Sequence, residues 1–187
     1  MNFKKTIPLN KPENKVFPES HDDPNREYEE DVTLVDLILV DSDLGKKELH
    51  SFINSSDEKE RVIAVDTIAQ LVLRDADYGK DILLDSMHYT NTNELTVAAN
   101  TITLLILHDS VYGKDILHGL LHSSYEKDLD IATIALARLL LHGSIYGQKT
   151  LTTLRTSTNQ NQQRIYADTR TLLTLLTLEQ LIDEKGL

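Results

Sequence analysis

One short motif recurs along the chain at a constant interval, and it limits the possible folds more than any other feature. Its third copy reads Asp109-Ser-Val-Tyr-Gly-Lys-Asp-Ile-Leu117. The glycines of the four copies are Gly45, Gly79, Gly113 and Gly147, so the motif has a constant 34-residue period. A fixed period of this length is typical of proteins built from stacked structural repeats. The sequence therefore predicts a repeat architecture.

Each 34-residue unit has the apolar pattern of two helices. The first helix is expected to begin at the Gly-Lys of the motif, because apolar residues then follow at helical spacing, as in Ile116, Leu117, Leu120 and Leu121. A polar loop follows, in which Asp57 and Asn91 are suitable N-caps for the second helix, each with a glutamate three residues later. The second helices carry matched apolar columns, with a small alanine in each. These alanines are Ala64, Ala98 and Ala132.

The two ends of the chain depart from this pattern. All four prolines lie within residues 1–24, which are polar, so we expect a flexible tail there and a helical-repeat domain over 25–187. Asp23 and Pro24 suit the start of a first helix that ends near Asp41. At the other end, one extra residue between 159 and 163 would move the small alanine to Ala167. A closing helix over 168–184 would then expose threonines, including Thr169.

The Tyr-Gly pair of the motif is expected to lie in the turn between units. A glycine with positive φ would let the chain reverse tightly between the second helix of one unit and the first helix of the next. Tyr78, Tyr112 and Tyr146 would then stack one per unit. We expect them to pack over the seam between units and to bond a helix end, with an aromatic ladder for ligands as the alternative.

The two-helix unit, the small alanine of the second helix and the lack of strand patterns resemble HEAT and armadillo-like α-solenoids. The resemblance covers about residues 25–185. Tetratricopeptide repeats have the same period, but their Trp and terminal Pro signature is missing here. The resemblance implies an all-α, right-handed α-solenoid of about four 34-residue two-helix repeats with a C-terminal capping helix. It also implies a concave surface, lined by the second helices, that holds a protein or peptide.

On that surface, the outward positions of the second helices change character from unit to unit while the apolar columns stay constant. Such a varied stripe on a shared scaffold is how repeat proteins select partners, although an ordinary solvated face is the simpler alternative. The candidate partner-binding residues are Asp36, Asp66, Gln70, Arg74, Asn100, His108, Arg138 and His142.

The charge distribution indicates the class of partner. The net charge is −11, but residues 31–98 carry −8 and residues 133–187 carry +2. This acidic field disfavours nucleic acid and favours a protein with a basic or bipolar surface. A more specific alternative is an acidic immunity- or inhibitor-type protein that masks a basic toxin or enzyme. An exposed terminal repeat also allows a homodimer.

No pattern indicates catalysis, so we expect a non-catalytic protein without cofactor or metal. His118 and His122 have the spacing of paired zinc ligands, but the glutamate of the metalloprotease motif is absent. An enzyme related to helical-repeat DNA-repair glycosylases or metal-dependent hydroxylases is the remaining alternative. The chain has no cysteine, no apolar segment behind its N-terminal lysines and no apolar run of membrane-spanning length. We therefore expect a cytoplasmic protein that does not enter membranes.

Overall fold

The computed structural model describes residues 33–88 and 91–185, and every regular element in these ranges is a helix. The prediction of an all-α fold is confirmed for these residues. The elements are α1 (Leu34–Leu39), α2 (Asp43–Ile53), α3 (Glu58–Leu73), α4 (Asp77–His88), α5 (Thr92–Leu107), α6 (Val111–Leu121), α7 (Glu126–Leu141), α8 (Ile145–Arg155) and α9 (Gln160–Lys185). We call α2, α4, α6 and α8 the first helices and α1, α3, α5, α7 and α9 the second helices.

The first helix that the structure describes is α1. Asp23, Pro24 and the predicted tail over 1–24 lie outside the described residues, and the helix that the structure describes begins at Leu34. Thr33 is its N-cap, and it forms a reciprocal capping box with Asp36. The expected end near Asp41 is confirmed, because the helix ends at Leu39 with Val40 as C-cap.

The 34-residue period continues to the end of the chain without the predicted extra residue. The helices α3, α5, α7 and α9 all begin at this same interval, and the last begins at Gln160 rather than 168. In this register Thr169 is fully buried and Ala167 is exposed, which reverses both predictions. The polar run before Ile165 resembles a loop in the sequence, but the Asn159 side chain accepts a hydrogen bond from the Gln162 N–H and caps the helix.

The motif glycines lie inside the first turn of the first helices, not in the turns before them. The first helices begin two residues before each glycine, and their N-caps include Ser42, Ser110 and Ser144, which accept from the glycine N–H three residues later. The expected N-caps Asp57 and Asn91 of the second helices are confirmed.

These glycines are needed for close approach of two helices rather than for positive φ. A Cβ added at Gly79 would lie 2.5 Å from the Cβ of Leu71, and one added at Gly113 would lie 2.7 Å from the Cβ of Leu105. Real side chains cannot come this near, so only glycine lets the first helix pack against the end of the preceding second helix. The prediction of a positive-φ glycine at this position was therefore wrong.

Positive φ occurs instead four residues earlier in each unit, at the residue after the C-cap of a second helix. Its φ is close to +60° at Asp41, Asp75 and Asp109, and it is +69° at Gly143. In each turn this residue donates its N–H to the carbonyl three residues back, and the next residue donates to the carbonyl five residues back. This is the Schellman arrangement, in which the left-handed residue stops the helix and satisfies its last carbonyls.

The tyrosines pack over the seams, as predicted, and each lies under a lysine of the preceding unit. Lys46 Nζ is 5.2 Å from the Tyr78 ring centroid, and the two equivalent lysine–tyrosine distances are both 5.8 Å. Each lysine also bonds the positive-φ aspartate of its own unit. The predicted hydrogen bond to a helix end is absent at Tyr78, whose buried hydroxyl has no partner. Each of these three seams therefore includes a cation–π contact.

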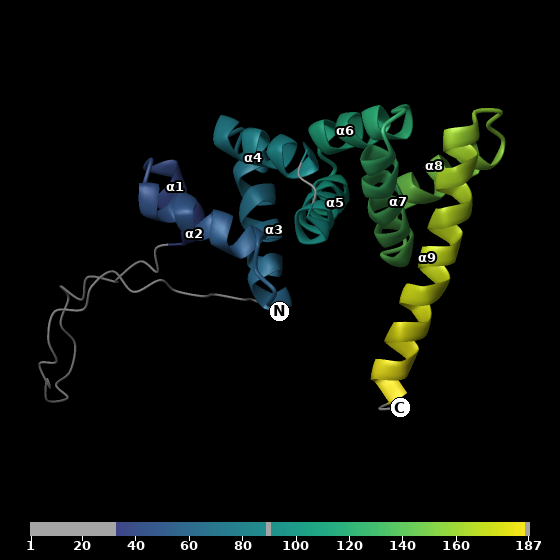
Figure 1. Ribbon diagram of the computed structural model, residues 1–187. Coiled ribbons are helices and arrows are strands. Elements are labelled where there is room, and N and C mark those ends of the chain that lie inside the picture. The colour runs from purple at the N-terminus through teal and green to yellow at the C-terminus, as the bar shows by residue number, and fades with distance from the viewer. Residues whose placement is uncertain (1–32, 89–90, 186–187) are drawn as a thin grey trace, which may run out of the picture.

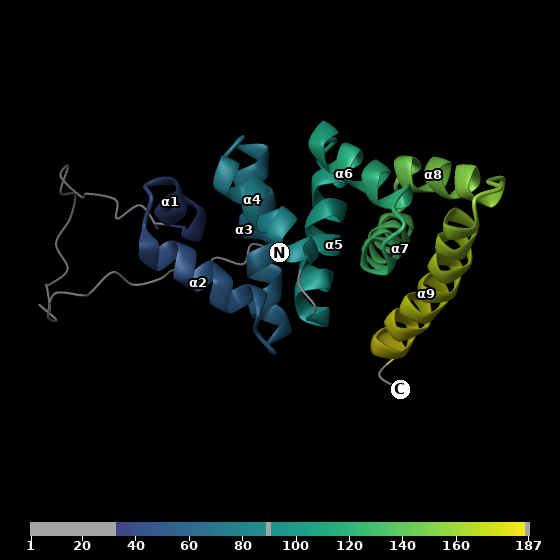
Figure 2. The same cartoon turned by 45° about the horizontal axis from the view of Figure 1, so that its top comes forward.

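The helices follow one another along the molecule, with α1 and α9 at opposite ends (Figure 1). Each second helix packs against the next one, α1 on α3, α3 on α5, α5 on α7 and α7 on α9. Each first helix packs between the second helix before it and the second helix after it. Figure 2 shows α4, α6 and α8 along one side of this series and α9 at its end, running away from α8.

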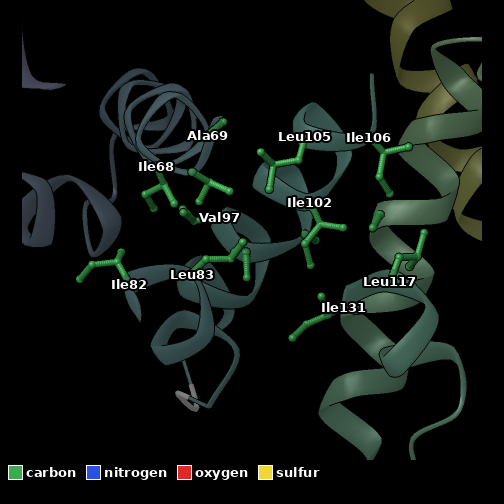
Figure 3. Close-up of a cluster of buried hydrophobic side chains, with 14 of the residues drawn as sticks. Ile68, Ala69, Ile82, Leu83, Val97, Ile102, Leu105, Ile106, Leu117 and Ile131 are labelled. Atoms are coloured by element: carbon green, nitrogen blue, oxygen red, sulfur yellow. The ribbon is translucent and has the colours of Figure 1, made fainter. Parts of the chain in front are cut away.

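The apolar core runs between the two sets of helices. Figure 3 shows Ile68, Leu83, Val97 and Ile102 pointing toward one another from α3, α4 and α5, and Ile131 of α7 continues the cluster. All five side chains are fully buried. The solvent side of the second helices is left as the surface on which unit-specific residues stand.

Candidate partner-binding face

The structure places the eight predicted residues on the solvent side of four consecutive second helices, α1, α3, α5 and α7. Asp66, Arg74, His108 and His142 are exposed, and the other four are half-buried. Because these helices pack side by side, the residues share one surface, which we call the second-helix face. It consists of Asp36, Asp66, Gln70, Arg74, Asn100, His108, Arg138 and His142.

At the N-terminal end of the face, opposite charges are paired across neighbouring helices. Arg74 Nη1 of α3 donates to Asp36 Oδ1 of α1 at 3.4 Å. Within α3, Gln70 Nε2 donates to Asp66 Oδ2 at 2.6 Å. The hydrogen bonds from the Thr33 side chain and backbone lower the pKa of Asp36, and Arg74 adds to this effect. Asp36 therefore stays ionised and holds Arg74 against the surface at neutral pH.

In the middle of the face, two polar atoms are buried without a hydrogen-bond partner. They are Asn100 Oδ1 on α5 and Arg138 Nε on α7. The two residues are 38 apart in the sequence, the same separation as that of the bonded pair Asp36 and Arg74. One atom is an acceptor and the other a donor, and each is a buried polar group without a partner, which costs stability in the free protein.

The two histidines of the face are C-caps of their helices. The backbone N–H of His108 donates to Leu104 O, and that of His142 donates to Arg138 O. Among the described residues, no group of three or more His, Asp or Glu side chains is arranged to hold a metal ion. His118 and His122 lie off the face, with ring centroids 4.3 Å apart, and His122 Nδ1 is 2.8 Å from the His118 carbonyl oxygen.

An ion cluster at the α7–α9 contact extends the face, and the sequence reasoning missed it. Arg164 reaches Glu126 at 3.2 Å, Asp168 at 3.3 Å and Asp130 at 3.6 Å. Burial raises the pKa of Asp130, while Arg164 opposes that rise. The predicted register left Arg164 outside the last helix, so this arginine was not paired with α7. In the observed register Arg164 follows Glu126 by 38 residues, as Arg74 follows Asp36.

An apolar line beside the face was also missed. Every second helix carries a leucine at the same position of the 34-residue unit, next to the C-cap in the first four helices. We call the five residues the leucine row; they are Leu39, Leu73, Leu107, Leu141 and Leu175. An alignment of the five units that compares the residue at every position, exposed or buried, would have shown this leucine.

Comparisons with known proteins do not assign this chain to a family. No protein-family model matches it, and neither a curated protein nor a solved structure does. Within the part of the chain that the structure describes, none of the helices combines the length and the apolar character needed to cross a membrane.

Proposed function

We propose that this protein is a right-handed α-solenoid of about four two-helix repeats, capped by α9, of the HEAT and armadillo-like kind. The proposal is supported by helix starts that recur with a 34-residue period. Among the second helices, each one contacts only its immediate neighbours in the series. In such an array each repeat buries its apolar columns against its neighbours, and one side of the second helices remains free.

We further propose that the protein acts without catalysis, by binding another protein on the second-helix face. The observation that carries this is the contrast between columns. The position of Leu71 is leucine in all five units, whereas the position of Asp66 is occupied by Asn100, Ile134 and Asp168 in later units. A surface that diverges while its scaffold stays constant is suited to one specific partner.

The partner is expected to have a basic or bipolar surface. The face carries two acidic residues, Asp36 and Asp66, and two arginines, Arg74 and Arg138, which suits a bipolar surface, and residues 31–98 carry a net −8. The same field supports the second candidate, an immunity- or inhibitor-type protein that masks a basic toxin or enzyme. For that candidate the association rate would fall steeply as salt is added, because steering by charge is screened.

Affinity purification with two charge-neutral double variants tests the face. Asp66→Lys with Arg74→Glu reverses two charges on the face, and Asp81→Lys with Lys149→Glu reverses two exposed charges on the first helices. We expect the first variant to lose a stoichiometric protein partner and the second to keep it, with equal helicity by circular dichroism. Retention by both variants would place the site elsewhere, and turnover of a substrate would overturn the non-catalytic reading.

A further inference from the structure

The leucine row is constant although it faces solvent. The exposed fractions of Leu39, Leu73, Leu107 and Leu175 are 46, 45, 41 and 52%, and Leu141 is half-buried. The buried columns are constant because packing requires it, and the exposed columns beside the row vary. The turn hydrogen bonds use backbone atoms and place no demand on this side chain. About half of the side chain is thus left exposed in four units, at a position that is leucine in all five.

The row is long and continuous enough to be a binding site. It crosses five helices that contact one another in order, and exposed Val40 and Leu178 lie at the first and last of these helices. Packed helices lie about 8–10 Å apart, so the row is about 32–40 Å long. An apolar line of this kind on a protein surface marks an interaction site.

We propose that residues 3–17 of this same chain bind along the leucine row. This segment combines five large apolar side chains, Phe3, Ile7, Leu9, Val16 and Phe17, with two prolines. Fifteen residues can span at most about 50 Å, so one segment is long enough to contact leucines on several neighbouring helices.

Charge favours this segment over the rest of the N-terminal region. Residues 3–17 carry four lysines and one glutamate, a net +3, whereas residues 32–98, which include the first two leucines of the row, carry −7. Residues 18–31 carry seven acidic side chains and one arginine, a net −6, so they are repelled by the same surface and suit a spacer. A basic stretch is thus followed by an acidic one, and only the basic stretch complements the net charge of the first repeats.

The length of the spacer lets the segment reach the row within one molecule. The described chain begins at Thr33, one short helix before Leu39, the first member of the row. The 15 residues from 18 to 32 span at most about 50 Å, more than the length of the row. A linker of this length keeps the local concentration of the segment at about the millimolar level, so weak contacts are enough to hold it.

Leu73 follows Gln70 by three residues and precedes Arg74, so the leucine row borders the second-helix face. The binding of residues 3–17 to the row does not rest on the proposed function.

A spin label on the full-length chain tests the proposal directly. The protein has no cysteine, so Asn10→Cys creates a single labelling site in the middle of the segment. Relative to a diamagnetic label, we expect the methyl signals of Leu73 and Leu107 to lose intensity about threefold, because tethering keeps the segment mostly bound. Leu84 on α4 is 40% exposed but lies off the row, so its signal should keep its intensity.

The matched variants make every outcome decisive. Phe3→Ser with Leu9→Ser, on the labelled chain, should restore the Leu73 and Leu107 signals, whereas the segment keeps its charge. Equal broadening of Leu84, no broadening at all, or broadening that survives these substitutions would each overturn the proposal. Broadening that arises only in mixtures of labelled and isotope-enriched molecules would assign the row to a second copy and would also overturn it. The experiment contains no partner, so its failure leaves the proposed function untouched.

Discussion

The turns after α1, α3 and α5 have the same backbone as the turn after α7, but different side chains support them. In the first three the left-handed residue is an aspartate that bonds a lysine five residues later, and that lysine lies over the tyrosine of the next unit. In the fourth, Gly143 takes the left-handed position and Gln148 replaces the lysine. The position equivalent to the tyrosine in the last unit is Gln180.

This difference shows that the fold requires the same backbone conformation in all four turns. The side chain at the left-handed position depends on whether the next unit has a tyrosine. A left-handed conformation costs an ordinary residue about 1–2 kcal/mol, and glycine avoids that cost. Aspartate tolerates it better than most residues and, through its lysine, links the turn to the next seam. The internal turns thus use a residue that connects units, and the terminal turn uses one that only permits the conformation.

The close-approach glycine in the helix after each of the four turns should be the most sensitive to substitution. Gly79→Ala places a methyl group against Leu71 backbone and side-chain atoms, so we expect a loss of about 3 kcal/mol in the free energy of unfolding. Gly119→Ala on α6 is the control, because nothing lies within 4 Å of its added Cβ and alanine favours a helix by about 0.5–1 kcal/mol. Urea denaturation measures both, and equal stability of the two variants would contradict the close-approach explanation.

Substitutions of the left-handed residue should have a smaller effect on stability, and this effect should differ between the terminal turn and the internal turns. Gly143→Ala has open space for its methyl group but must adopt a φ of +69°, so we expect a loss of about 1 kcal/mol. Asp109→Gly should change stability less, because relief of the left-handed conformation offsets the lost bond to Lys114. Thermal denaturation distinguishes the two variants. A larger loss for Asp109→Gly would mean that the lysine link outweighs backbone conformation.

The smallest effect is expected at the link itself. Lys80→Met removes the bond to Asp75 and the cation over Tyr112, so the pKa of Asp75, which the Lys80 hydrogen bond lowers, should rise toward 3.8. Because the folded pKa is lowered, the stabilisation is present above the unfolded pKa and is lost as pH falls through the folded value. NMR titration of the Asp75 carboxyl checks the shift, with Lys47→Met as the exposed control. An unchanged pKa in Lys80→Met would show that the bond is not formed in solution.

Much of the architecture follows from the sequence alone. The 34-residue period, the two helices of each unit, the N-caps Asp57 and Asn91, and the buried columns that contain Ala64 and Leu71 are local or periodic properties, and the structure agrees with each. The outward position of Asp66 and Arg74 follows from the same periodicity, because residues four apart share one side of a helix. Whether these residues bind a partner stays a prediction.

Only the tertiary structure decided what depends on contacts between units. Glycine suits both a positive φ and a close helix contact, so the sequence could not say which one Gly79 serves until Leu71 was placed against it. A polar run such as 159–163 suits both a loop and a capped helix start, and only packing on α7 set the register that buries Thr169. Periodicity assigns a residue to one side of its own helix, whereas the neighbouring helix decides whether that side is core, seam or surface.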